Sequence, residues 1–176
     1  MLPSAAEPDL AALIAALDRH GVDYVLVGGM AARVYGSTLP TQDLDILTRD
    51  MPDNMIRLAA ALNELGAHSD LADNASADAL WGMNTSWDTD AGAVDVLVVA
   101  KGPRGTTVNW RMVQDNANTI RHGEVSVRIA SLEDLLIMKL AVGRPRDLAA
   151  AEQLVPGSTD AFRGLAGPDD EAGTSS

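Results

Sequence analysis

The sequence of 176 residues lacks cysteine, has only 3% aromatic residues and contains no long apolar run. Without cysteine, it can form neither disulfides nor thiolate zinc sites. No segment approaches the roughly 18 consecutive apolar residues of a membrane helix, so no membrane span is expected. Residues 1–9 contain no basic segment followed by an apolar run, so no secretion signal is expected either. These features fit a globular protein of the cytoplasm.

Lysine is also scarce, since Lys101 and Lys139 stand against eleven arginines. The net charge of −12 argues at first against a nucleic-acid partner, because phosphates repel an acidic surface. The charge is unevenly distributed, however. Residues 101–146 hold eight basic and four acidic side chains, a local +4 that leaves −16 for the rest. This basic half can face a polyanion, or its charges can be scattered over a solvated surface.

Hydrophobic spacing predicts helices at residues 9–20, 30–35, 53–65, 132–140 and 147–154. It predicts strands at residues 23–27, 43–46, 81–88, 93–99, 118–121 and 125–129, the last four as two hairpins. This order indicates a mixed α/β or α+β domain, a small twisted sheet flanked by helices. We assign it to residues 1–155. Residues 156–176 are rich in glycine, proline, serine, threonine and acids, which predicts a disordered acidic tail.

Two carboxylates, Asp43 and Asp45, alternate with Leu44 and Ile46 in the period of a strand. Side chains two residues apart share one face, about 6–7 Å apart at the backbone, so both can reach one cation. Mg²⁺ commonly takes one or two carboxylates together with substrate phosphates. The alternative is a strand whose polar face simply meets water.

Two further features stand near these acids. Gly28 and Gly29 follow a short buried strand and precede a helix, where backbone N–H groups can approach a phosphate. An ordinary turn is the alternative.

Asp95 lies between apolar neighbours in a strand, where an acid costs stability unless it is paired or coordinating. If its strand neighbours the first, Asp95 can bind the metal or act as a base; otherwise it is an edge-strand acid.

Together, Gly28-Gly29, Thr41-x-Asp43-Leu-Asp45-Ile and Ala93-Val-Asp95-Val resemble the DNA polymerase β-like nucleotidyltransferase superfamily. The resemblance spans residues 23–99. It implies that the glycine turn binds a nucleoside triphosphate and that Asp43, Asp45 and Asp95 hold Mg²⁺.

A second segment, residues 136–148, is similar to the AbiEii/MenT-like branch, the nucleotidyltransferase toxins of bacterial toxin–antitoxin pairs. In that branch a helix lysine and an aspartate that begins the next helix belong to the active site. They correspond to Lys139 and Asp147. A lysine among apolar residues, in a chain that otherwise uses arginine, supports a compact cation for the triphosphate. The alternatives are a lysine reaching to solvent and an acid at a helix N-terminus.

The sequence therefore predicts an enzyme that moves NMP from an NTP to an acceptor hydroxyl and releases pyrophosphate. The resemblance implies the 3′ end of tRNA as acceptor and a cognate antitoxin as partner. Three alternatives stay open. They are transfer to a protein or a small molecule such as an aminoglycoside, a nucleotide-binding antitoxin or regulatory module without turnover, and an interaction domain with coincidental motifs.

Overall fold

The computed structural model describes residues 7–165 and is built around one mixed sheet. The strand order is β3-β4-β2-β1-β8-β7. The pairs β2–β4 and β1–β8 are parallel, and the pairs β1–β2, β3–β4 and β7–β8 are antiparallel. The strands of this sheet are β1 (Tyr24–Leu26), β2 (Asp43–Thr48), β3 (Thr85–Trp87), β4 (Ala93–Leu97), β7 (Asn118–His122) and β8 (Val125–Ile129).

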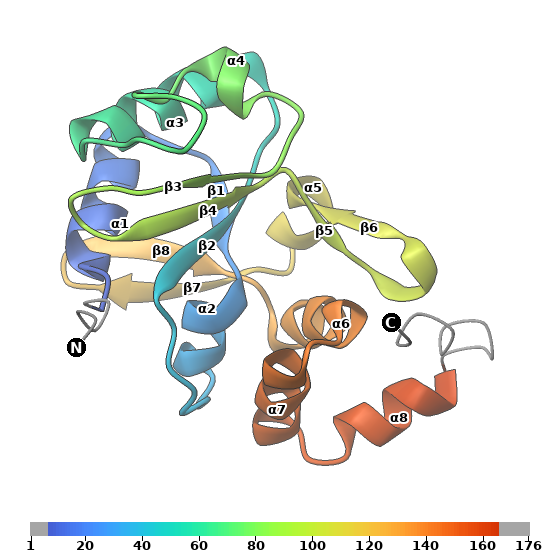
Figure 1. Cartoon of the computed structure of the whole chain (residues 1–176). Coiled ribbons are helices and arrows are strands. Elements are labelled where there is room, and N and C mark those ends of the chain that lie inside the picture. Colours follow the sequence, from blue (N-terminus) through green and yellow to red (C-terminus); the bar gives the residue numbers. More distant parts are fainter. Residues whose placement is uncertain (1–6, 166–176) are drawn as a thin grey trace, which may run out of the picture.

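Helices cover this sheet, as predicted. Figure 1 shows α3 and α4 above the sheet, and α2, α6 and α7 below it. The helices are α1 (Leu10–Arg19), α2 (Gly28–Val34), α3 (Pro52–Glu64), α4 (Ala77–Leu80), α5 (Trp110–Gln114), α6 (Leu132–Val142), α7 (Pro145–Leu154) and α8 (Ser158–Leu165). The predicted fold class, a mixed α/β domain with a small sheet between helices, is therefore confirmed. Within residues 7–165, no helix has both the length and the apolar character needed to cross a membrane.

The central strands follow the predicted alternation of apolar and polar residues. In β2, Leu44 and Ile46 are fully buried, while Asp43 and Asp45, which alternate with them, are only partly buried. In β4, Val94 and Val96 are buried on either side of Asp95. The apolar face of each strand therefore packs into the core, and the acids stand on the opposite face.

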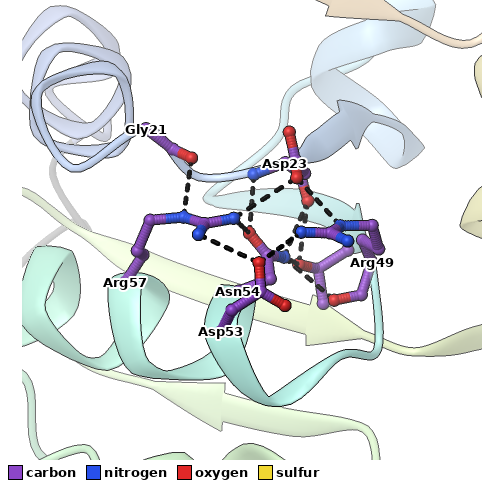
Figure 2. A network of polar contacts seen from close by, with 7 residues as sticks. Gly21, Asp23, Arg49, Asp53, Asn54 and Arg57 are labelled. Carbon is purple, nitrogen blue, oxygen red and sulfur yellow. Dashed lines mark hydrogen bonds and ion pairs between the residues drawn. The ribbon is translucent and has the colours of Figure 1, made fainter.

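A polar network fixes the far end of β2 (Figure 2). The buried side chain of Asn54 accepts the N–H of Asp23 at 2.8 Å and donates to the Thr48 hydroxyl at 2.9 Å. It also donates to the carbonyls of Arg49 and Asp23, at 2.9 and 3.0 Å. Around this amide, the Asp23 carboxylate pairs with Arg49 at 2.8 Å and with Arg57 at 3.4 Å. One buried amide thus joins α3 to the ends of β1 and β2.

Two local predictions differ from the structure, and one short helix was not predicted. Helix α2 begins at Gly28 and not at Met30, because Gly28 takes a positive φ of 66° that turns the chain directly into the helix. The strand expected over residues 81–88 is confined to Thr85–Trp87. Before it lies the short helix α4, which the Ser76 hydroxyl caps by accepting the N–H of Ala79 at 3.1 Å.

The segment between β4 and β7 contains elements that the sequence analysis did not predict. Strands β5 (Val99–Lys101) and β6 (Thr107–Asn109) form a separate two-stranded sheet, joined by the 3-10 turn η1 (Pro103–Gly105). Figure 1 shows this arm extending beside α6, and α6 contacts both β5 and η1. The short helix α5 follows directly after β6.

The predicted disordered tail also differs from the structure over part of its length, because α8 is helical. The Glu152 carboxylate, on α7, accepts hydrogen bonds from the N–H groups of Gly157 and Thr159, at 2.5 and 3.3 Å. It also accepts the Thr159 hydroxyl at 2.8 Å. An acid on the preceding helix thus satisfies N–H groups at the start of α8. Residues 166–176 of the predicted tail lie outside the described part of the chain.

Candidate active site

A pocket of about 460 Å³ lies where α2, β2, α6 and α7 meet. One wall carries the glycine turn and the β2 acids. Another carries cations from α6 and from the start of α7. The lining includes Gly28, Gly29, Thr41, Asp43, Asp45, Lys139, Arg144, Arg146 and Asp147. Segments from both halves of the chain therefore meet around one cavity of the size that small ligands occupy.

The register of the sheet brings Asp95 beside Asp45. Strands β2 and β4 run parallel, and these two residues are direct partners across them. Neighbouring strands lie about 4.8 Å apart, so the two carboxyl groups stand side by side on one face. The Ser86 hydroxyl, on β3, donates to the Asp95 carboxylate at 2.6 Å. The strand of Asp95 therefore neighbours that of Asp45, which is the condition under which Asp95 can take part in the site. Asp95 itself does not line the pocket.

Burial and neighbouring charges act strongly on the Asp45 carboxyl. Burial, followed by the negative charges of Asp43 and Asp95, raises the pKa of its carboxyl from 3.8 to about 7. The Gly29 N–H, which donates to this carboxyl, and the positive charge of Lys139 act in the opposite direction. Two acidic neighbours and burial favour either a proton or a cation at this position.

The glycine turn packs directly against side chains of β2 and of the segment just before it. A Cβ atom built on Gly28 would lie 2.0 Å from Asp45 Oδ2, and one on Gly29 would lie 2.7 Å from Thr41 Oγ1. Gly28 also has the positive φ noted above, so it has two reasons to be glycine. The turn therefore serves the placement of β2 and its acids as well as the start of α2.

Lys139 and Asp147 form the opposite wall. Both are buried, with 7% and 6% exposure, and Lys139 Nζ lies 3.9 Å from Asp147 Oδ1. Asp147 also pairs with Arg144, whose Nε lies 2.6 Å from Asp147 Oδ2. Burial lowers the pKa of Lys139, the negative charges of Asp147 and Asp45 raise it, and Arg144 and Arg146 add to the lowering. Asp147 thus holds two cations at the pocket, one buried and one half exposed.

The loop after α2 completes the pocket, and Gln153 on α7 fixes it. The Gln153 amide oxygen accepts the Ser37 hydroxyl at 3.0 Å and the Thr38 N–H at 3.1 Å. Its amide nitrogen donates to the Thr38 hydroxyl at 3.1 Å. Ser37, Leu39 and Pro40 line the pocket from this loop. Helix α7 therefore both supplies an acid to the pocket and holds the loop across from it.

The donor set suits Mg²⁺. Asp43 and Asp45 are hard oxygen ligands on one strand face, and the crowding of negative charge around Asp45 is relieved by a divalent cation. Among residues 7–165, no group of three or more His, Cys, Asp or Glu side chains forms a ready-made metal cage. Mg²⁺ usually binds through one or two carboxylates and completes its shell with water and phosphate oxygens. Two convergent acids fit that mode of binding.

The structure brings all but one of the predicted residues to the pocket: Gly28, Gly29, Asp43, Asp45, Lys139 and Asp147 line it. The sequence analysis missed Thr41 as a contact of Asp43, Arg144 and Arg146 as pocket cations, and Gln153 as the support of the loop. The two arginines flank Pro145 just before Asp147, so their position beside a predicted site residue was an available signal.

Comparison of the sequence with known proteins finds no match. No protein-family model matches it, and no curated protein matches it.

Solved structures do match. The chain is similar to the lincosamide antibiotic adenylyltransferase LnuA with lincomycin bound, with a TM-score of 0.57 and 14% identity over 83% of this chain and 94% of that one. It is similar to the antibiotic-resistance factor ANT(2'')-Ia, with a TM-score of 0.53 and 16% identity over 89% of this chain and 88% of that one. It is also similar to an antigenic nucleotidyltransferase-like protein from Paracoccidioides brasiliensis, with a TM-score of 0.51 and 14% identity. That match covers 91% of this chain and 77% of the other.

Because the sequence identities are only 14–16%, the similarity to these three structures shows the fold alone. The chain has the fold of nucleotidyltransferases. This fold agrees with the one that the resemblance to the nucleotidyltransferase superfamily implies. The narrower resemblance to the AbiEii/MenT-like toxin branch finds no such support.

Proposed function

We propose that this protein is a magnesium-dependent nucleotidyltransferase, which moves NMP from an NTP to an acceptor hydroxyl and releases pyrophosphate. The observation that carries the proposal is one pocket with Asp43 and Asp45 on one wall and Lys139 and Arg144 on another. Acids for a metal and cations for phosphates are the two charges that transfer of a nucleotide needs. The nucleotidyltransferase fold of the chain supports the same reaction.

In this mechanism the protein acts mainly by positioning and by compensating charge. Asp43 and Asp45 would hold Mg²⁺, and the ion would supply positive charge against the phosphate oxygens of the triphosphate. Lys139, held by Asp147, binds the phosphates from the opposite wall. The acceptor oxygen forms a bond to the α-phosphorus, the bond from the α-phosphorus to the bridging oxygen breaks, and pyrophosphate leaves. We assign Asp95, beside Asp45, to orienting the acceptor hydroxyl and taking its proton.

The acceptor has two candidates, each supported by a different observation. Arg144 and Arg146 at the pocket favour an anionic acceptor such as the 3′ end of tRNA, and modification there would make the protein a cytoplasmic toxin with a cognate antitoxin. A small molecule is favoured by the solved structures, since LnuA is an antibiotic adenylyltransferase crystallised with lincomycin and this chain spans 94% of its length. A protein acceptor has no specific support.

The test is transfer of label from each radioactive NTP to total tRNA and, in parallel, to lincosamides and aminoglycosides. Labelled tRNA alone selects the first acceptor, and a labelled antibiotic alone selects the second. Asp43→Ala should abolish transfer, because the metal loses a ligand. The matched control is Asp73→Ala, which removes an exposed acid outside the pocket. Transfer retained by Asp43→Ala would overturn the assignment of the site.

A nucleotide-binding antitoxin or regulatory module without turnover is separated by a second measurement. Calorimetry with Mg²⁺ and an NTP reports binding, while release of pyrophosphate reports turnover. Binding without release in the presence of every acceptor class would favour the regulatory module. Toxicity on expression that Asp43→Ala relieves would instead favour the toxin.

A further inference from the structure

The two glycines of the Gly28-Gly29 turn pack against different side chains. Gly28 packs on Asp45 itself, since an added Cβ would lie 2.0 Å from Oδ2 and 2.4 Å from the carboxyl carbon. Gly29 packs on Thr41, since an added Cβ would lie 2.7 Å from Oγ1 and 2.9 Å from the threonine Cβ. The space that a side chain at position 29 would need is already filled by Thr41.

Thr41 in turn contacts Asp43. Its hydroxyl lies 3.4 Å from Asp43 Oδ1 and 3.2 Å from the Asp43 carbonyl oxygen, and donates toward both. Thr41 is only 8% exposed, and what remains exposed belongs to the lining of the pocket. A hydroxyl with restricted freedom thus stands between the glycine turn and the first acid of the strand.

We propose that Thr41 is a positioning residue that orients the Asp43 carboxylate toward the cation, and that Gly29 is glycine because Thr41 occupies its side-chain space. The inference rests on the proposed function only in that Asp43 holds a cation. It goes beyond that function by assigning the two glycines separate tasks. Gly28 makes room for Asp45, and Gly29 makes room for the threonine that orients Asp43.

The first experiment measures binding of Mn²⁺ alone by electron paramagnetic resonance, without nucleotide or acceptor. Thr41→Val keeps the shape of the side chain and removes the hydroxyl. We expect about tenfold weaker Mn²⁺ binding, the effect of removing one hydrogen bond to a charged group. Thr41→Ser restores the hydroxyl and should recover most of the affinity. The matched control is Thr119→Val, on the exposed strand β7 away from the pocket, which should bind as the wild type does.

The second experiment measures thermal unfolding in EDTA, so it needs no ligand. Gly29→Ala should lower the melting temperature by about 4–8 °C, because its Cβ overlaps Thr41. In the Thr41→Gly background the same change should cost almost nothing, because the overlapping atoms are gone. This double-mutant cycle stays readable even if Gly29→Ala alone does not fold, since the double variant and Thr41→Gly can still be compared.

Three results would overturn the inference while leaving the proposed function intact. The first is Mn²⁺ binding by Thr41→Val equal to that of the wild type. The second is a loss of stability in Gly29→Ala that is unchanged by Thr41→Gly. The third is an equal loss of affinity in Thr41→Val and Thr41→Ser, because the side-chain packing and not the hydroxyl would then matter. Failure of the proposed metal site looks different, since the wild type itself would bind no Mn²⁺.

Discussion

Replacing Asp45 by asparagine should stabilise the metal-free protein while destroying its site. Burial and two neighbouring acids raise the pKa of Asp45 to about 7, from 3.8. A rise of about three units corresponds to about 4 kcal/mol, at roughly 1.4 kcal/mol per unit. This is the cost of keeping the charged carboxylate in the folded protein above pH 7. Asparagine has the same shape, carries no charge and can still accept the Gly29 N–H.

The expected gain in the free energy of unfolding is smaller than this electrostatic cost, because the amide of asparagine must also be buried. We expect Asp45→Asn to add about 2 kcal/mol at pH 8, or roughly 4–8 °C in melting temperature. The gain should shrink at lower pH. Because the folded pKa of Asp45 is the higher one, the folded protein binds more protons than the unfolded chain between about pH 4 and pH 7. At pH 5 Asp45 is therefore mostly protonated in the folded protein. Less than half of the free-energy cost of its buried charge then remains, so asparagine gains less.

Urea denaturation of both proteins in EDTA, at pH 5 and pH 8, tests this prediction. The matched control is Asp73→Asn, which removes an exposed acid and should change stability little at either pH. A variant no more stable than the wild type at pH 8 would refute the reasoning, as would a gain that is larger at pH 5. Addition of Mg²⁺ with an NTP should then raise the melting temperature of the wild type and leave that of Asp45→Asn unchanged.

Three further predictions concern the rest of the molecule. Asn54→Ala should lower the free energy of unfolding by about 2–4 kcal/mol in urea titrations, because Asp23 and Thr48 lose their buried partners; a change below 1 kcal/mol would contradict this. Lys139→Gln should slow transfer about a hundredfold or more through loss of a phosphate-binding cation, whereas Lys101→Gln, at the other lysine of the chain, should leave initial rates unchanged. Removing divalent cations with EDTA should abolish transfer, and Mg²⁺ alone should restore it; transfer in EDTA would exclude the proposed role of the acids.

The parts of the fold that the sequence predicted are those whose signal is local. The alternation of Asp43 and Asp45 with buried neighbours describes β2 because a strand side chain faces either core or solvent. The two hairpins were predicted for the same reason. The pairing of Asp45 with Asp95 is not local. The alternation shows which face each acid takes, but only the sheet order shows that β2 and β4 are neighbours.

The parts that the sequence did not predict depend on contacts between distant segments. Strands β5 and β6 have three residues each, too few for alternation to be recognised. Helix α8 follows a segment of helix-breaking composition and begins against Glu152, which no local pattern reveals. Gln153 reads as an ordinary polar helix residue, yet it holds the loop at Ser37, more than a hundred positions earlier. The sequence predicts a phosphate-binding turn at the two glycines, but their contacts with Asp45 and Thr41 depend on how α2 packs on β2.

The two walls of the pocket are also synthesised at different times, because they come from distant parts of the chain. Gly28 to Asp45 belong to the first third of the chain, whereas Lys139 and Asp147 lie on α6 and α7, about a hundred residues later. A ribosome therefore completes the acidic wall long before the basic wall exists. Until α6 packs against α2, Lys139 does not face Asp45, and until α7 is in place the loop at Ser37 lacks Gln153. Prematurely terminated chains should consequently be inert toward nucleotides, and activity should begin only once synthesis of the domain is nearly finished.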